Sequence, residues 1–478
     1  MILIFTCLFW NFEEPNKLTT IINLTFTYFL GVYFIFKFWN KKNIIKVQLW
    51  TFIYFLKIFF SIIFLYFFIA TPLIPIDKLR TSFQDPLLTD SNFYDFIALE
   101  IKKNGLFDNF NLFFSTWLSF GIILYTYLIY FFMGTSILYI TFCNCFLILI
   151  SSLFFSSSVK IFINDLKDYK FGLISLFMIL PYCTYYDLTP SKETLSVFVL
   201  SYFFYQLSKY VYSKENRRIF NLFLSISLVF FVRPNLGVLI IPILLFFLHK
   251  KISILKLSVS IIFLFTLILI YFHFTIGLDT ILNAYTDFSR VTENQQNNAD
   301  LVSNGDGVKS YIFLLFSPTG LFSTLFLFPF RLIIWLLLPF PYIFFDFSQI
   351  FALPDTLSSN WNLYYRIPES IFRLASTHLI ISSLPFIYLT VKKIYWRQNL
   401  NYLLNFTWLF FLVLTIALST FNFANGGRYR IVIEPFYFLL VIFGFHLSKF
   451  KIKTISMYYI SYFFLFFIIN IFYYLVHL

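Results

Sequence analysis

The chain has 478 residues, of which 60% are hydrophobic and only 12% are charged, and its formal net charge is +13. Soluble domains carry about 25% charged residues, so the composition excludes a soluble protein as well as collagen, coiled-coil and disordered chains. Apolar runs longer than about 18 residues recur along the sequence, without the apolar–polar alternation of an outer-membrane barrel. The sequence therefore predicts an all-α protein that crosses the inner (plasma) membrane many times.

The expected membrane spans follow one another along the chain. In order, they are 19–38, 47–70, 115–133, 136–156, 171–187, 194–210, 218–232, 236–248, 253–274, 325–345, 370–390, 402–421, 431–447 and 455–476. A shorter stretch at 311–324 is either an interfacial helix or a further span, because Pro318 and Gly320 interrupt it. We therefore expect a polytopic transmembrane helical bundle of about 12–15 spans.

Short basic segments set the expected orientation. Lys and Arg are concentrated at 37–46, 209–218, 250–256, 392–397 and 449–453. Since short cytoplasmic loops carry an excess of Lys and Arg, we expect these segments in the cytoplasm and the polar segments between the spans outside. Parity then requires an even number of crossings between Asp90 and Lys192, so the apolar run at 171–187 is expected to be a partial or re-entrant helix.

The first outer loop contains the pattern of a short amphipathic helix. Thr89 and Asp90 are both favoured N-cap residues, and Gly105 is a favoured residue just after a helix end. Between them, an apolar face recurs at helical spacing. Its members are Phe93, Phe96, Ile97 and Ile101. We therefore predict an interfacial helix near 90–104, in which Asp90 is either only the cap or a reactive carboxylate.

Three residues of this helix carry a family resemblance. Asp90, Tyr94 and Ala98 stand four residues apart, and Gly105 follows the helix. This pattern resembles the GT-C superfamily of membrane glycosyltransferases, among them the protein mannosyltransferases and aminoarabinose transferases. Ser91 follows Asp90 where a second carboxylate would stand, and the sequence has no D-x-D, so metal dependence of the oligosaccharyltransferase kind is not expected. Further elements resemble the superfamily in the same order: Gly134-Thr135-Ser136, Asn144, Pro181 to Glu193, Arg233-Pro234 and Arg428 to Pro435.

The resemblance implies a metal-independent, inverting enzyme of cell-envelope glycan or glycolipid assembly. It would take a sugar from a polyprenyl-phosphate carrier and pass it to a lipid or glycan acceptor outside the membrane. Asp90 is then the expected catalytic base, because a carboxylate at the water–membrane boundary accepts the proton of an acceptor hydroxyl. The departing lipid phosphate needs cations. The residues expected to bind the substrates are Tyr94, Lys192, Glu193, Arg233, Arg428 and Arg430.

The basic residues of this set also have structural alternatives. Lys192 suits the start of a helix, and Arg233 suits a turn before Pro234. Arg428 and Arg430 suit headgroup contacts at a helix end. A helix separates side chains two positions apart by about 200°, so both arginines can reach one phosphate only from an extended or turn backbone. The glycine pair before Arg428 favours such a turn.

Two further basic residues, Lys57 and Arg331, lie inside apolar runs. Charges within spans tend to mark function, but a long side chain can also extend to the membrane surface. The spacing of the cysteines and histidines favours no metal site, and no cofactor is expected. Membrane lipids are expected partners, and nucleic acid is not.

On this interpretation the chain has four parts. They are an N-terminal span with a basic cytoplasmic loop (1–46), a catalytic transmembrane module (47–275) that includes the outer loop 71–112, a polar extracytoplasmic loop (276–310) and a C-terminal transmembrane module (311–478). Two rival functions stay open. A polysaccharide polymerase of the O-antigen or capsule type would carry R-x₁₀-G, which the sequence lacks, and a lipid-linked glycan flippase or transporter would show internal repeats, which we do not find.

Overall fold

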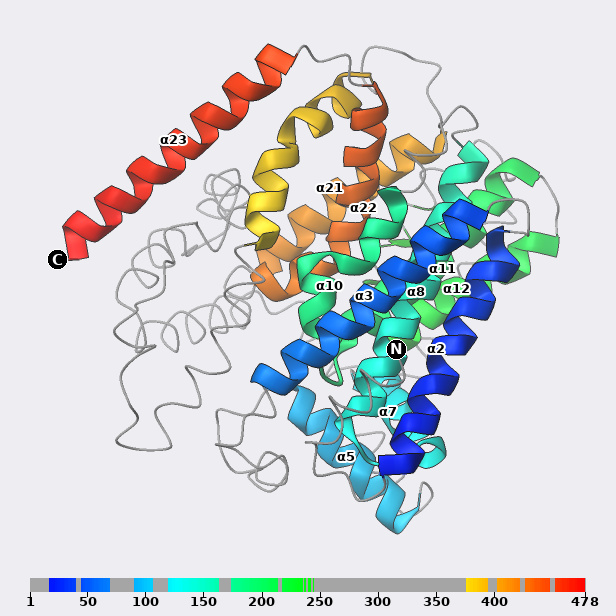
Figure 1. Ribbon diagram of the computed structural model, residues 1–478. Coiled ribbons are helices and arrows are strands. Elements are labelled where there is room, and N and C mark those ends of the chain that lie inside the picture. Colours follow the sequence, from blue (N-terminus) through cyan, green and yellow to red (C-terminus); the bar gives the residue numbers. More distant parts are fainter. Residues whose placement is uncertain are drawn as a thin grey trace, which may run out of the picture. The chain divides into compact units, whose positions relative to one another are not determined.

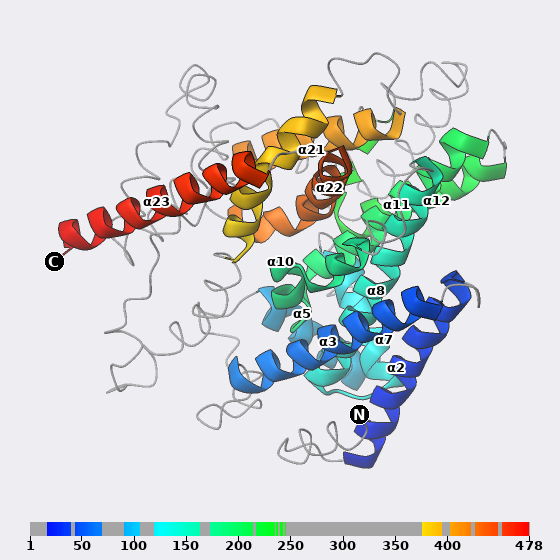
Figure 2. The same ribbon diagram turned by 45° about the horizontal axis from the view of Figure 1, so that its top comes forward.

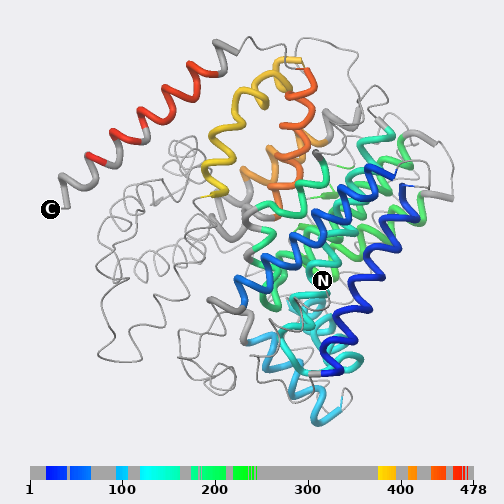
Figure 3. Tube along the Cα trace, in the orientation of Figure 1, coloured from blue at the N-terminus to red at the C-terminus, as the bar shows by residue number. Residues whose placement is uncertain are grey.

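A computed structural model shows the arrangement of the helices (Figures 1 and 3). It describes residues 17–39, 44–68, 90–105, 119–162, 173–213, 217–234, 236–237, 240–241, 244, 375–393, 402–421, 426–447 and 452–477. Every regular element in these residues is a helix, which confirms the predicted all-α class. The expected loop at 276–310, the stretch at 311–324 and Arg331 lie outside the described residues.

The chain divides into two compact units, which we describe separately. Unit 1 consists of 1–237, 343–376 and 442–448, and unit 2 of the rest. The first 237 residues contain nine labelled helices in the described ranges. These are α2 (Lys17–Trp39), α3 (Ile44–Phe68), α5 (Asp90–Asn104), α7 (Phe120–Phe132), α8 (Ile137–Phe162), the 3₁₀ helix η2 (Leu173–Ile179), α10 (Pro181–Tyr186), α11 (Lys192–Ser213) and α12 (Arg217–Val232).

Three of these helices contain stretches that are long and apolar enough to cross a membrane: Leu18–Trp39, Ile44–Leu65 and Ile137–Ile161. The shorter two have 22 residues, which corresponds to about 33 Å and exceeds the roughly 30 Å of a bilayer's hydrocarbon core. The exposed side of α2 is itself apolar, with large side chains every three or four residues. They are Leu18, Ile22, Phe26, Phe29, Tyr33 and Phe36. Such a surface suits lipid, and the protein is a membrane protein.

Close packing joins α2 to α3. A Cβ atom at Gly31 would lie 2.4 Å from the Tyr54 ring, so only glycine fits at this crossing. Tyr28 stacks on Tyr54 with ring centroids 5.8 Å apart, and Trp39 meets Trp50 at 5.7 Å where the two helices come together. Figure 2 shows α2 and α3 meeting at one end and diverging from there. Because the backbones approach at a small residue, van der Waals contact stabilises the pair inside an apolar solvent.

The helix directions create two distinct ends in unit 1. Thr20 and Tyr139 share a hydrogen bond of 2.9 Å, so α2 and α8 begin at the same end. Helix α11 packs along α8 and begins at this same end. Helices α3 and α12 run in the opposite direction and end here. The other end carries Lys37, Lys46, Lys160 and Lys209 and the start of α12 at Arg217, whereas the first end has Lys192 and Arg233.

The apolar run at 171–187 forms two short elements instead of one span. The 3₁₀ helix η2 has 7 residues and α10 has 6, which corresponds to about 14 Å and 9 Å. Neither length crosses a bilayer of about 30 Å, so the prediction of a partial helix is confirmed. A turn at 187–191 then leads directly into α11.

Unit 2 is held by hydroxyl groups that bond to neighbouring helices. Its described helices are 375–393 from residue 377 onward, α21 (Tyr402–Phe421), α22 (Gly426–Leu447) up to residue 441, and α23 (Ile452–His477). Tyr437 of α22 donates to the Ile380 carbonyl at 2.7 Å, and Thr390 donates to the Leu440 carbonyl at 2.8 Å. On α23, Tyr459 donates to the Ser382 carbonyl at 3.0 Å. These bonds connect helices whose remaining contacts are largely apolar.

Candidate functional site

The turn between α10 and α11 is held inside the bundle by donors from α8. Asn144 uses its amide nitrogen to donate to the carbonyls of Asp187 and Thr189, both at 3.1 Å. Thr141 donates to the carbonyl of Leu188 at 3.0 Å. Asn144 lies seven positions into α8, about 10 Å from its start. Non-helical backbone at such depth is tolerated only where protein groups satisfy it, and these side chains do so.

Two more side chains complete this arrangement. Tyr125 of α7 donates its hydroxyl proton to the Asn144 side-chain oxygen at 2.9 Å, so the amide has one defined orientation. Ser191 donates to the Tyr186 carbonyl at 2.8 Å. The carbonyls of four consecutive residues, 186 to 189, therefore all accept side-chain hydrogen bonds. The turn is consequently a fixed part of the core.

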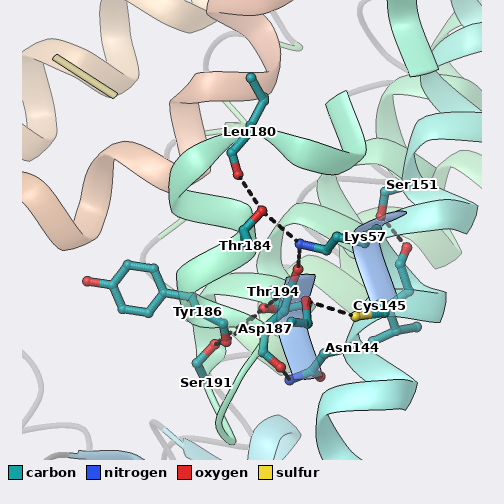
Figure 4. Close-up of polar contacts among 12 residues, drawn as sticks. Lys57, Asn144, Cys145, Ser151, Leu180, Thr184, Tyr186, Asp187, Ser191 and Thr194 are labelled. Atoms are coloured by element: carbon teal, nitrogen blue, oxygen red, sulfur yellow. Dashed lines mark hydrogen bonds and ion pairs between the residues drawn. The ribbon is translucent and has the colours of Figure 1, made fainter. Parts of the chain in front are cut away.

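An ion pair lies at the centre of the same turn (Figure 4). Lys57 of α3 contacts Asp187, and both side chains are 0% exposed. The Lys57 ammonium also donates to Thr184 of α10 at 3.2 Å, and Thr194 of α11 donates to the other Asp187 oxygen at 2.7 Å. Lys57 therefore does not extend to the membrane surface. Because each charge is paired and hydrogen-bonded, removing one partner of such a pair typically costs about 3–5 kcal/mol.

Lys192 follows the turn as the first residue of α11. Its ammonium nitrogen lies 5.1 Å from the centre of the Tyr94 ring, which belongs to α5. Tyr94 is 2% exposed and packs with Ile97 and Ile122 in an apolar cluster between α5 and α7. A cation over an aromatic ring within about 6 Å is attracted by the ring's electrons. This contact brings two sequence-predicted site residues together.

Glu193 and Arg233 form the second contact at this end of the bundle. The guanidinium nitrogen lies 3.1 Å from the carboxylate oxygen. Arg233 directly follows α12, and its backbone N–H continues the helix by donating to the Val229 carbonyl at 2.8 Å. The sequence-predicted residues Tyr94, Lys192, Glu193 and Arg233 therefore form two contacts, made by the first two residues of α11.

Asp90 is the first residue of α5, as predicted, and it precedes Tyr94 by about one helical turn, or 6 Å along the axis. The helix ends as predicted as well. Gly105 has a φ of +89° and its N–H donates to the Ile101 carbonyl at 2.9 Å. This left-handed residue closes the helix in the way that favours glycine. The carboxylate of Asp90 lies outside the described side chains.

A second carboxylate of α5, which was not among the predicted site residues, is part of the packing with α7. Asp95 is 8% exposed and accepts a hydrogen bond from the hydroxyl of Tyr130. Lys102 donates to the backbone carbonyl of Tyr130 at 2.6 Å. Both bonds attach α5 to the end of α7. Their effect is to fix the helix that begins at Asp90.

The turn expected before Arg428 is not found. Helix α22 begins at Gly426, so positions 428 and 430 are helical and lie about 200° apart around its axis. A spanning helix must satisfy its own backbone groups, which favours continuing the helix to the membrane boundary despite two glycines. The side chains of Arg428 and Arg430 lie outside the described ones, in unit 2.

The sequence also carries a signal for the partner of Lys57. Lys57 is a charge in a long apolar run, and Asp187 is an acid directly after another such run. Charges inside spans pair with one another, so each predicts a partner of opposite sign. Among the described residues, no group of three or more His, Cys, Asp and Glu side chains is placed to hold a metal ion. Comparisons of the chain with known protein families, with curated proteins and with solved structures find no match.

Proposed function

We propose that the chain is a membrane glycosyltransferase of the GT-C kind. It moves a sugar from a polyprenyl-phosphate carrier to a lipid or glycan acceptor on the extracytoplasmic face, in the assembly of cell-envelope glycans or glycolipids. One observation carries the proposal. Tyr94 of α5, Lys192 and Glu193 of α11 and Arg233 after α12 meet at one end of unit 1, beside the helix that begins at Asp90.

In this proposal Asp90 is the base that accepts the proton of the acceptor hydroxyl. It lies on the helix that carries Tyr94, and the ring of Tyr94 holds the ammonium of Lys192. The proposal thus assigns the base to α5 and the cation to α11, two helices that are in contact through Tyr94 and Lys192. That is the combination that sugar transfer from a phosphate carrier needs, because one group deprotonates the acceptor while the other stabilises the charge of the leaving phosphate.

Lys192 is the described cation best placed for the donor phosphate. Arg233 already compensates Glu193, so its role is to fix the start of α11 rather than to contact the lipid directly. Lys192 follows the fixed turn and lies beside α5. A compact ammonium with three N–H donors binds phosphate oxygens well. The sequence resemblance adds one of the arginines of α22, Arg428 or Arg430, as a further proposed phosphate contact.

The distribution of charge supports an extracytoplasmic site. The more basic end of unit 1 is opposite to the Tyr94–Lys192 contact: its helix ends adjoin the sequence segments 37–46 and 209–218, with four Lys or Arg residues each, whereas Lys102, Lys103, Lys192 and Arg233 lie on the side of the contact. By the positive-inside rule, the basic end faces the cytoplasm. The proposed site then opens toward the outer leaflet, where a lipid-linked donor is available after it has been moved across the membrane.

A lipid-linked glycan flippase or transporter is the second candidate. The observation that favours it is the Lys57–Asp187 pair, because charges buried within spans are common on transport pathways. The two functions differ in chemistry. A glycosyltransferase breaks the bond between the sugar and the phosphate, and a transporter leaves it intact.

The deciding experiment measures transfer in proteoliposomes from labelled polyprenyl-phosphate sugars to lipid or glycan acceptors. Asp90→Asn should reduce the rate by about 10²–10⁴, the usual contribution of a general base, and should fold normally because Asn caps a helix as well as Asp. The matched control is Glu100→Gln, a carboxylate of the same helix that accepts hydrogen bonds from its neighbours Lys103 and Asn104. Full transfer by Asp90→Asn would reject Asp90 as the base. Movement of intact lipid-linked glycan without bond cleavage would favour the transporter.

A further inference from the structure

The Lys57–Asp187 pair lies where a charge is expensive. Lys57 is 13 positions into α3, about 20 Å from its start and inside the apolar stretch Ile44–Leu65. An apolar pair of similar volume would often be at least as stable in such a place. Stability alone therefore does not explain two charges at this place. An ion pair differs from an apolar pair because it forms directional hydrogen bonds.

The bonds of the pair determine where α11 begins. One oxygen of Asp187 pairs with Lys57, and the other accepts a hydrogen bond from Thr194. The carboxylate therefore connects the turn at 187–191 both to α3 and to the start of α11. Lys57 also bonds to Thr184, which donates onward to the carbonyl of Leu180 (Figure 4). The segment from 180 to 194 is thereby fixed at both ends, and Lys192 lies within it.

We propose that Lys57 and Asp187 are positioning residues, whose buried ion pair fixes the turn at 187–191 and so holds Lys192 beside Tyr94 and Glu193 beside Arg233. Neither residue touches substrate. The geometric part of this proposal is independent of the reaction, and its consequence for donor binding rests on the proposed function. Two separate measurements therefore test it.

The geometric measurement uses a cysteine that the chain already has. Cys183 of α10 is 0% exposed, and its carbonyl accepts the N–H of Asp187 at 3.2 Å, so its reactivity reports on opening of the turn. With the other three cysteines replaced by serine, the rate of reaction of Cys183 with N-ethylmaleimide is measured in the purified full-length protein in nanodiscs. A second background retains only Cys143 of α8, whose thiol contacts Met133 at the end of α7 and so reports on the contact between α7 and α8.

Lys57→Met should accelerate the Cys183 reaction at least about fivefold, because the segment opens locally, and should leave the Cys143 reaction unchanged. Since this variant leaves a buried carboxylate uncompensated, Lys57→Met combined with Asp187→Asn is measured alongside it. The double variant removes both charges but keeps an oxygen for Thr194, and the same acceleration is expected. Ser61→Ala is the matched control. Ser61 is one turn from Lys57, equally buried, and bonds to α8 rather than to the turn.

The functional measurement is the KM for the polyprenyl-phosphate sugar in proteoliposomes. The double variant should retain the melting temperature of the parent and raise this KM about tenfold or more, because Lys192 is no longer held in place. Parental Cys183 reactivity in the double variant would overturn the proposal. So would a faster Cys183 reaction with an unchanged KM, since the pair would then serve stability alone. If the parent itself transfers no sugar, the proposed function fails, and Cys183 reactivity still decides whether the pair fixes the turn.

Discussion

Glu193 and Arg233 are 40 residues apart in the sequence, and their ion pair of 3.1 Å joins the start of α11 to the residue that follows α12. Glu193 is fully buried and Arg233 is 12% exposed, so the arginine compensates a carboxylate that water does not reach. Helix α11 ends at Ser213 and α12 begins at Arg217, so the other ends of the two helices are close in the sequence. The pair therefore closes the open end of a helical hairpin.

Loss of this arginine is expected to destabilise the protein strongly. Arg233→Met should lower the free energy of unfolding by about 3–5 kcal/mol, because it leaves the Glu193 carboxylate buried without its partner. Combining it with Glu193→Gln should recover most of the loss. The control is Lys103→Met, whose partner Glu100 lies 3.2 Å away at an exposed site and whose removal should cost less than about 1 kcal/mol. Denaturant titrations in micelles measure the free energy of unfolding of the three variants and of the parent. Equal stability of Arg233→Met and Lys103→Met would contradict the expectation.

Removal of the Lys192 charge is expected to weaken donor binding. Lys192→Met should raise the KM for the lipid-linked donor about tenfold or more, and Lys192→Arg should retain most of the activity because it keeps a cation over Tyr94. The control is Lys209→Met, which removes an equivalent contact 4.1 Å above the Tyr205 ring at the other end of α11. Transfer assays in proteoliposomes compare the three. A similar loss in the Lys209 variant would point to a general effect on α11 instead.

The crossing of α7 and α12 is expected to tolerate only glycine. A Cβ atom at Gly121 would lie 2.9 Å from the Phe231 carbonyl oxygen and 3.0 Å from the Val232 Cα, both of which are backbone atoms. Gly121→Ala should therefore cost about 1–3 kcal/mol, the usual range for overpacking. Leu128→Ala, at an exposed position of the same helix, is the control and should change stability little. Melting temperatures in detergent are sufficient to compare them, and an equally stable Gly121→Ala protein would show that α12 can shift.

Orientation is expected to follow the basic residues. Single cysteines in a cysteine-free background should react with an impermeant maleimide from outside when they replace Asn92, Asp300 or Asn425, and should not when they replace Asn43, Glu215 or Ile452. Labelling in intact cells gives the answer, and permeabilised cells show that all six sites are reactive. The reverse pattern would place the proposed site in the cytoplasm and remove the argument for a lipid-linked donor.

Only one of the two arginines in α22 is expected to bind the donor phosphate, because positions 428 and 430 lie about 200° apart on a helix. We expect Arg428→Lys to reduce turnover about tenfold or more, since lysine keeps the charge but loses the paired N–H donors. Arg430→Lys should change turnover little. Rates of transfer from a polyprenyl-phosphate sugar test both variants, and parental rates in both would identify the two arginines as headgroup anchors.

Local sequence signals predicted the local elements well. The helix from Asp90 to Asn104 and the glycine that ends it follow from capping preferences and from the spacing of apolar residues. The partial helix at 171–187 followed from counting crossings. These features depend on a few neighbouring residues or on a simple parity, so they are present in the sequence itself.

Pairing across the bundle was not predictable in the same way. Lys57 meets Asp187 only because α3, α10 and α11 pack around one point, and no spacing in the sequence encodes that meeting. The prediction of a turn at Gly426 was wrong, because α22 begins at this residue. A helix in lipid has to satisfy its own backbone hydrogen bonds, and this requirement outweighs the local preference of glycine for turns. Long-range topology and the surrounding lipid decide such cases.

The turn at 187–191 also constrains how the protein enters the membrane during synthesis. Donors for its carbonyls come from Asn144 and Thr141, which are made before it, and the partner of the Asp187 carboxylate on α11, Thr194, is made after it. Until α11 has left the ribosome and docked, one oxygen of the buried Asp187 carboxylate lacks its hydrogen-bond donor, and lipid does not supply one. Integration of the segment from 173 to 191 is therefore expected to wait for α11, so that the two enter the bilayer as one hairpin.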